Sequence, residues 1–333
     1  MILYDFDYER AASFEDASEK LRGLGAGARV AAGGTDLLPN MRTEIVRPAT
    51  PISLAALSPE PPSLLPDGSI RIDALTRLAA LENFALVRTA LPMLAKAAAS
   101  VAGNQIRQMG TLGGNLCQET RCLYLNQKHD YQFKAPCYKR GGDLCYPFPT
   151  NARGTCWSVH MSDTAPALIS LDAQVEVHGE AGIRRMNVES LYTGDGMSPI
   201  QLAHDELLTA VVIPRAPARS GWGYCKSARR GGLEFGIAVI AVSLRLDETS
   251  GVCRSARIVI GAVRERPVRL VAAEEALTGR APDEATLAEV ATAAAKELNP
   301  LPHHGFTKSY IRDDVRIKLR RTLESAAHKA RGR

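Results

Sequence analysis

The 333-residue sequence contains no apolar run approaching the roughly 18 residues needed to cross a membrane. Its first residues, MILYDFDYER, carry acids where a secretion signal needs a basic start and an apolar core. Aromatic residues make up only 5% of the chain, and no stretch interleaves them with basic residues as nucleic-acid-binding surfaces do. These absences predict a soluble cytoplasmic protein that binds neither a membrane nor nucleic acid.

The remaining composition is typical of a globular protein. Hydrophobic residues make up 45% and charged residues 23% of the chain. A chain of 333 residues is longer than one ordinary hydrophobic core requires, so we expect two domains. In a cytoplasmic protein thiols stay reduced, and cysteines close in sequence first suggest a metal or cluster site.

The first two thirds of the chain predict alternating helices and strands. Ser13 is suited to start a helix that ends at Gly25, and a short strand should follow around Val30. The Ala- and Leu-rich stretch 76–102 predicts two helices joined near Pro92. Further strands are predicted within residues 50–57, 69–75, 163–179 and 206–214.

The stretch PRAPARSGWG, residues 214–223, has the composition of a linker. We therefore predict one domain over residues 1–218 and a second over residues 219–333. The second domain should be a short sheet covered by helices. Its strands are predicted within residues 235–247 and 253–263, and its helices within 267–279, 283–298 and 308–330.

Two glycine pairs are the first candidates for a ligand site. One lies in VAAGGTDLLPNMR, directly after a predicted strand, and the other in TLGGNL, residues 111–116. Glycine allows positive φ and brings backbone N–H groups close to an anion, so the two loops together could hold a diphosphate. Neither loop has a spaced-glycine nucleotide motif, and each taken alone is better explained as a turn.

The order of several motifs resembles that of the FAD-binding subunits of the molybdenum hydroxylases, the family of xanthine dehydrogenase and carbon monoxide dehydrogenase. AGGTDLLPNMR and TLGGNL are followed by SDTAPALISLDA, DELLTAVVIP and GYCKSARR. The resemblance covers the whole chain and implies an α+β fold. It implies a two-part FAD-binding domain of the vanillyl-alcohol-oxidase (PCMH) type, followed by a smaller α/β domain of the carbon monoxide dehydrogenase flavoprotein type.

The same resemblance implies which residues bind FAD. One side of the diphosphate would be wrapped by the first glycine loop and the other side by the second, and single residues further along would contact the rest of the cofactor. Lys226 would lie beside the flavin ring, where a cation stabilises the charge of the reduced ring; the alternative is a surface lysine on an edge strand. The implied residues are Val30, Ala31, Ala32, Gly33, Gly34, Thr35, Asp36, Leu37, Val101, Thr111, Leu112, Gly113, Gly114, Asn115, Asp163, Leu208 and Lys226.

Four cysteines follow the second glycine loop: Cys122, Cys137, Cys145 and Cys156, separated by 14, 7 and 10 residues. A zinc site normally has a pair of cysteines two to four residues apart, and these gaps contain none. A [4Fe–4S] cluster binds one thiolate per iron, so widely spaced cysteines on a wrapping loop can reach it. The spacing therefore favours the cluster and leaves zinc or unrelated thiols as alternatives.

This cysteine segment, about residues 118–158, is longer than the corresponding connection in ordinary members of the family. An FAD subunit with such an insertion resembles the β subunits of the 4-hydroxybenzoyl-CoA reductases, which carry an extra [4Fe–4S] cluster. Cys117 is a competing thiol, expected to pack against the second glycine loop. Aromatic residues that could shield a cluster are Tyr124, Tyr131, Phe133, Tyr138, Tyr146, Phe148 and Trp157, and Lys139 and Arg140 could offset its charge.

The resemblance implies an electron-transfer subunit without catalytic residues of its own. Its partners would be a molybdenum-pterin large subunit and a [2Fe–2S] small subunit, in a dimer of heterotrimers, with ferredoxin as the electron donor. The complex would reductively remove the hydroxyl of 4-hydroxybenzoyl-CoA to give benzoyl-CoA. Two alternatives remain open at this point: an oxidative molybdenum hydroxylase acting on another aromatic or heterocyclic substrate, and a zinc-stabilised interaction protein without enzymatic activity.

Overall fold

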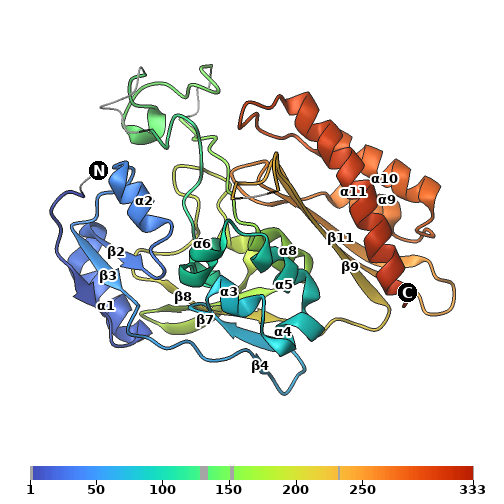
Figure 1. Cartoon of the computed structure of the whole chain (residues 1–333), viewed down its shortest axis with the longest axis horizontal. Coiled ribbons are helices and arrows are strands. Elements are labelled where there is room, and N and C mark those ends of the chain that lie inside the picture. Colours follow the sequence, from blue (N-terminus) through green and yellow to red (C-terminus); the bar gives the residue numbers. More distant parts are fainter. Residues whose placement is uncertain (1–2, 128–133, 151–153, 232, 333) are drawn as a thin grey trace.

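The computed structural model describes residues 3–127, 134–150, 154–231 and 233–332. Within these residues the strands form three sheets, with the orders β1-β3-β2, β4-β5-β8-β6-β7 and β12-β11-β10-β9. Figure 1 shows the first two in one half of the molecule and the third in the other half, beneath the C-terminal helices. No helix in these ranges is long and apolar enough to span a membrane.

The first sheet contains β1 (Glu9–Arg10), β2 (Ala28–Ala31) and β3 (Thr50–Ser53), all parallel. Helix α1 (Phe14–Leu24), whose presence and ends were predicted, packs on it. Ser13 caps the helix by accepting a hydrogen bond from the N–H of Asp16, and Gly25 ends it at a φ of 60°. The short helix α2 (Leu37–Arg42) follows β2 and the first glycine loop.

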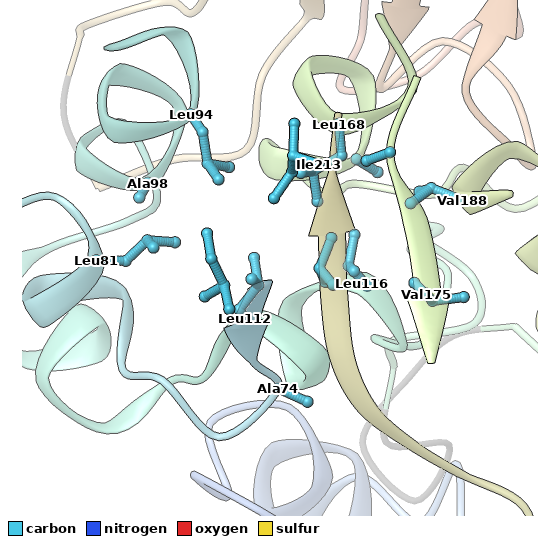
Figure 2. Close-up of a cluster of buried hydrophobic side chains, with 14 of the residues drawn as sticks. Ala74, Leu81, Leu94, Ala98, Leu112, Leu116, Leu168, Val175, Val188 and Ile213 are labelled. Carbon is cyan, nitrogen blue, oxygen red and sulfur yellow. The ribbon is translucent and has the colours of Figure 1, made fainter. Parts of the chain in front are cut away.

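The second sheet is antiparallel and consists of β4 (Ser63–Leu64), β5 (Ile70–Asp73), β6 (Gln174–Gly179), β7 (Gly182–Asn187) and β8 (Leu207–Ile213). Its helices are α3 (Leu78–Leu81), α4 (Ala85–Ala90), α5 (Pro92–Ala99), α6 (Asn104–Met109), α7 (Leu112–Leu116) and α8 (Thr164–Ser170). Figure 2 shows apolar side chains of α3, α5, α7 and α8 meeting those of β6 and β8 in one core, with Leu112 and Leu116 in its centre.

The C-terminal sheet consists of β9 (Ser220–Ser227), β10 (Ala238–Leu246), β11 (Cys253–Gly261) and β12 (Val268–Arg269). Helices α9 (Val271–Leu277), α10 (Glu284–Glu297) and α11 (Lys308–Ala330) lie together over one face of it (Figure 1). The predicted short sheet covered by helices is confirmed. The mixed fold of two parts is confirmed as well.

One local prediction was wrong, and another held only in part. The stretch 76–102 forms α3, α4 and α5 instead of two helices, because Asn83 ends α3 by donating its side-chain amide to the Ala79 carbonyl at 2.7 Å. The stretch predicted as a linker includes the start of β9, whose glycines serve the packing of α11. A Cβ at Gly221 would lie 2.0 Å from the Ala326 carbonyl oxygen, so only glycine lets the helix come this close.

The cysteine segment leaves the second glycine loop and returns to it through a short antiparallel pairing. Arg121 N–H donates to the Val159 carbonyl at 2.7 Å, and Val159 N–H donates back at 2.9 Å. Between these residues the segment extends away from the sheets (Figure 1). Its two ends are therefore fixed on the same face of the first domain.

Candidate functional site

The two glycine loops predicted from sequence meet in the structure, but the second forms the short helix α7, with Thr111 as its N-cap. We keep the name second glycine loop for residues 111–116. Gly33 lies against the end of α6, where an added Cβ would be 1.9 Å from the Met109 carbonyl oxygen. Gly34 has a φ of +71°, which favours glycine. The second loop begins immediately after α6, and Leu78 N–H binds the Gly110 carbonyl at 2.9 Å. The close contact at Gly33 fixes the distance between the loops.

A cavity of about 580 Å³ lies along both loops. It extends from the glycines to β8 and to the turn before it. His204 in this turn lies beside Arg29 of β2, with His204 Nδ1 3.3 Å from Arg29 Nη1. The predicted site residues that line it are Val30, Ala32, Gly33, Gly34, Thr35, Asp36, Leu37, Thr111, Gly113, Gly114 and Leu208. We call it the larger cavity.

A second cavity, of about 350 Å³, adjoins the first. It shares Thr35, Asp36, Thr111 and Gly114 with the larger cavity, so the glycine loops form the border between the two. The predicted residues that line only this smaller cavity are Val101, Asn115, Asp163 and Lys226. Two predicted residues line neither: Ala31, at the end of β2, and Leu112, whose side chain is in the core.

The first glycine loop has unused hydrogen-bond donors at this border. Among the described residues, no acceptor takes the backbone N–H groups of Gly33, Gly34 or Thr35. Adjacent free N–H groups on a turn with positive φ form an anion-binding concavity. The cavity border could therefore hold a diphosphate, and the predicted role of the two loops stays a prediction.

The smaller cavity contains a buried ion pair. Lys226 Nζ lies 2.7 Å from Asp163 Oδ2 and also donates to the Ser100 carbonyl at 2.9 Å. Burial raises the pKa of Asp163 to about 6, and the Lys226 charge opposes this rise. Within the described part of the chain, the buried Asp163 Oδ1 has no hydrogen-bond partner. Asp163 lines the cavity, so its carboxylate could accept a hydrogen bond from a ligand hydroxyl there.

Several residues around this cavity were not predicted as site residues. Arg121 forms an ion pair with Asp36, and its guanidinium carbon lies 5.4 Å from the centre of the Phe235 ring. Leu233, Glu234 and Phe235 line the cavity from the loop between β9 and β10. For Arg121 the only sequence signal was its position next to Cys122. For residues 233–235 it was their position soon after Lys226.

The four predicted cysteine ligands are arranged in two pairs along the cysteine segment. Cys122 comes directly after Arg121, and Cys156 comes shortly before Val159, the two residues that pair at the base of the segment. Cys137 and Cys145 flank a turn in which Tyr138 N–H donates to the Leu144 carbonyl at 2.9 Å. Burial raises the pKa of the Cys122 thiol, and the charges of Cys156 and Cys137 raise it further. Cys137 and Cys156 are each only 7% exposed.

A preformed single-ion site is not present: among the described residues, no group of three or more His, Cys, Asp or Glu side chains could hold a metal ion. Cys117 packs in the core beside the larger cavity, and burial raises its thiol pKa to about 12. Cys225 and Cys253 lie in strands, as predicted, and Cys253 is fully buried while Cys225 is partly exposed.

The aromatic residues of the segment form two separate contacts. Tyr124 and Tyr146 stack with ring centres 4.8 Å apart, and Phe148 packs on Trp157 with ring centres 5.5 Å apart. Tyr131 and Phe133, also predicted to shield a cluster, lie outside the described residues. Lys139 donates to Glu119 at 2.6 Å, and Arg140 donates to the carbonyls of Leu125, Gln127 and Thr43. Both basic residues thus hold the segment in place.

Comparison with known proteins gives the class of the chain. Residues 4–216 match the family model of the FAD binding domain in molybdopterin dehydrogenase, and residues 222–326 match the carbon monoxide dehydrogenase flavoprotein C-terminal domain. The chain belongs to this family of FAD-binding subunits, and FAD is its cofactor. The boundary predicted at residue 218 stays a prediction.

Particular relatives extend over nearly the whole chain. It is 31% identical to the aldehyde oxidoreductase FAD-binding subunit PaoB of Escherichia coli K12, over 82% of this chain and 86% of that one. It is 28% identical to the 6-hydroxypseudooxynicotine dehydrogenase complex subunit alpha of Paenarthrobacter nicotinovorans, over 98% of this chain and 96% of that one. The structure of reconstituted CO dehydrogenase from Oligotropha carboxidovorans includes a similar chain, with a TM-score of 0.77, 26% identity, and 98% and 99% coverage.

Proposed function

We propose that FAD extends across both cavities, with its diphosphate at their shared border. The free N–H groups of the first glycine loop and the shared residues Thr35 and Thr111 would hold the diphosphate. The flavin ring would occupy the smaller cavity beside Lys226, and Asp163 would accept a hydrogen bond from the ribityl chain. The observation that carries this proposal is the buried Lys226–Asp163 ion pair, because both residues line a cavity that adjoins the glycine loops.

We further propose that Cys122, Cys137, Cys145 and Cys156 bind a [4Fe–4S] cluster. The supporting observation is that all four cysteines lie on one segment whose two ends are paired, with Cys137 and Cys156 buried. The absence of a single-ion site among the described residues does not count against it, because a cubane cluster holds its four thiolates farther apart than one ion does.

In the proposed function the chain is the electron-transfer subunit of a molybdenum enzyme. FAD supplies two-electron and one-electron chemistry, and a cluster would supply single electrons from a low-potential carrier such as ferredoxin. The partners would be a molybdenum-pterin large subunit and a [2Fe–2S] small subunit, assembled as a dimer of heterotrimers. This chain's own residues would hold the two redox groups near each other and exclude water from them.

The proposed overall reaction is the reductive dehydroxylation of 4-hydroxybenzoyl-CoA. Two electrons and two protons enter, the phenolic C–O bond is broken, and benzoyl-CoA and water leave. Substrate chemistry would take place in the partner subunit.

Metal and flavin analysis of the purified chain tests the cofactor content. We expect about four irons, four acid-labile sulfides and one FAD per chain. Cys137→Ser should remove the iron and its visible absorption while FAD stays bound, and the matched control Cys225→Ser in β9 should retain both. Unchanged iron content in the Cys137 variant would show the ligand assignment to be wrong, and a colourless chain with zinc would support the zinc-stabilised interaction protein instead.

The second candidate is an oxidative molybdenum hydroxylase with another substrate, and the relatives favour it equally. An aldehyde oxidoreductase and a 6-hydroxypseudooxynicotine dehydrogenase complex are among the enzymes with a subunit that this chain resembles. The purified complex should be assayed with a low-potential donor and 4-hydroxybenzoyl-CoA, and separately with aldehydes and N-heterocycles and a dye acceptor. Turnover in only the second assay would reject the reductive function.

A further inference from the structure

The base of the cysteine segment holds a residue of the first glycine loop. Asp36 lines both cavities, and its carboxylate is bound by the guanidinium of Arg121 and by the backbone N–H of Glu119 at 3.0 Å. Asn40 donates to the same carboxylate at 3.1 Å. Two of these three partners therefore belong to the cysteine segment, more than 80 residues further along the chain.

Arg121 also contacts the opposite side of the smaller cavity. Its guanidinium lies 5.4 Å from the Phe235 ring centre, within cation–π range, and Phe235 lines that cavity. Its backbone makes both hydrogen bonds of the Arg121–Val159 pairing. The Arg121 side chain thus connects the first glycine loop with the loop between β9 and β10, and its backbone joins the two ends of the cysteine segment.

A second connection leads from Asp36 into the segment. Glu119, whose N–H binds Asp36, accepts hydrogen bonds from Lys139 at 2.6 Å and from Thr120 Oγ1 at 3.1 Å. Thr120 Oγ1 lies 2.5 Å from Ser158 Oγ, which lies 3.1 Å from the Cys156 sulfur. Thr120, Ser158 and Cys156 are all buried, so water does not compete for these contacts.

We propose that Arg121 is a positioning residue that couples FAD binding to the folding of the base of the cysteine segment. Asp36 is oriented for FAD only when residues 119–122 and 156–159 are in place, and bound FAD in turn stabilises this base. Such coupling is reciprocal, so each event should favour the other by the same factor. The proposal rests on the FAD site proposed above.

The test compares Arg121→Gln with Arg42→Gln in the full-length protein. Arg42 is an exposed arginine on α2, close to the same glycine loop but lining neither cavity. We expect Arg121→Gln to weaken FAD binding about tenfold and Arg42→Gln to leave it unchanged. Arg121→Lys keeps the charge without the planar group and should be intermediate; it also serves if the Gln variant does not fold.

The second readout is hydrogen exchange at the Arg121 and Val159 amides with and without FAD. FAD should slow exchange there about tenfold in the wild-type chain, and this protection should be lost in Arg121→Gln. Equal FAD affinity and equal protection in both arginine variants would overturn the coupling. If Gly33→Ala also binds FAD normally, the proposed FAD site itself is wrong, so the two failures are distinguishable.

Discussion

At the scale of single residues, burial shifts the pKa values of two groups, three residues apart in the chain, in opposite directions. Burial raises the pKa of Asp163 to about 6 and lowers the pKa of His160 to about 4. Lys226 partly compensates the carboxylate, while His160 packs against Tyr192 with ring centres 4.7 Å apart. Burial of the Asp163 carboxyl and of the His160 imidazole lowers the free energy of unfolding. The size of each effect changes with pH over the same range.

The first prediction concerns this pH dependence. Between about pH 4 and pH 6 folded Asp163 holds a proton that the unfolded chain has lost, so its contribution to stability falls as the pH rises. Folded His160 lacks a proton that the unfolded chain holds, so its contribution rises with pH over that range. In the flavin-free wild-type chain the two contributions oppose each other. Asp163→Asn should leave the histidine contribution unopposed and steepen the rise by on the order of 1 to 3 kcal/mol.

Urea unfolding at several pH values between 4 and 7 measures this difference. Lys226→Met should act in the opposite sense, because loss of the ammonium raises the Asp163 pKa further and extends the fall in stability to higher pH. Parallel stability profiles for wild type and Asp163→Asn would contradict the buried, raised carboxyl group.

Most of the predicted FAD-binding residues could be recognised from sequence because short motifs carry them. The glycine pairs, Asp163 and Lys226 each stand in a motif of the family, and the structure brings them to two adjoining cavities. Arg121 could not be recognised, because its role depends on contacts with Asp36, 85 residues earlier, and with Phe235 in the other domain. The contacts of the predicted FAD-binding residues with FAD stay a prediction.

At the scale of elements, the second prediction concerns the contact between the first glycine loop and α6. Gly33→Ala would place a Cβ 1.9 Å from the Met109 carbonyl oxygen, so the loop or the helix must move. Because the loop provides the N–H groups for the diphosphate, we expect FAD affinity to fall by at least about tenfold. Titration of the flavin-free protein with FAD, followed by flavin fluorescence, measures the loss.

The matched control is Gly23→Ala in α1. An added Cβ at Gly23 has no atom within 4 Å, and the residue is exposed on a helix. This variant should bind FAD normally and gain about 0.5 to 1 kcal/mol of stability from helix propensity. Similar FAD affinities in the two glycine variants would show that the close contact does not define the loop.

Capping residues and periodicity in the sequence predicted the elements whose signals lie close together in the chain. The caps of α1 and the alternation of β5 are examples, since both depend on residues close in the chain. The start of β9 was missed because Gly221 and Gly223, usual signs of a turn, instead allow the Ala326 and Thr322 carbonyls of α11 to approach the strand. Such glycines can be interpreted only when the partner helix is known.

At the scale of the whole molecule, the smaller cavity is built from both domains. Val101, Asn115 and Asp163 come from the first domain, and Lys226 and Phe235 come from the second. Tyr224 on β9 joins them, with its hydroxyl 2.9 Å from Ser100 Oγ and 3.2 Å from the Asp163 carbonyl. A ligand in this cavity should therefore stabilise the C-terminal domain as well as the first.

The chain's two tryptophans allow this third prediction to be tested separately for the second domain. Trp157 lies in the cysteine segment and Trp222 in β9, so Trp157→Phe leaves Trp222 as the reporter for the C-terminal domain. At a free FAD concentration one hundred times Kd, a domain that binds FAD only when folded gains about 2.7 kcal/mol. The urea midpoint reported by Trp222 should rise accordingly, and the rise should become smaller in Tyr224→Phe, which lacks the hydroxyl contacts with Ser100 and Asp163. A Trp222 midpoint that does not respond to FAD would mean that the C-terminal domain folds independently of the flavin, and that Lys226 lies outside the energetically important part of the site.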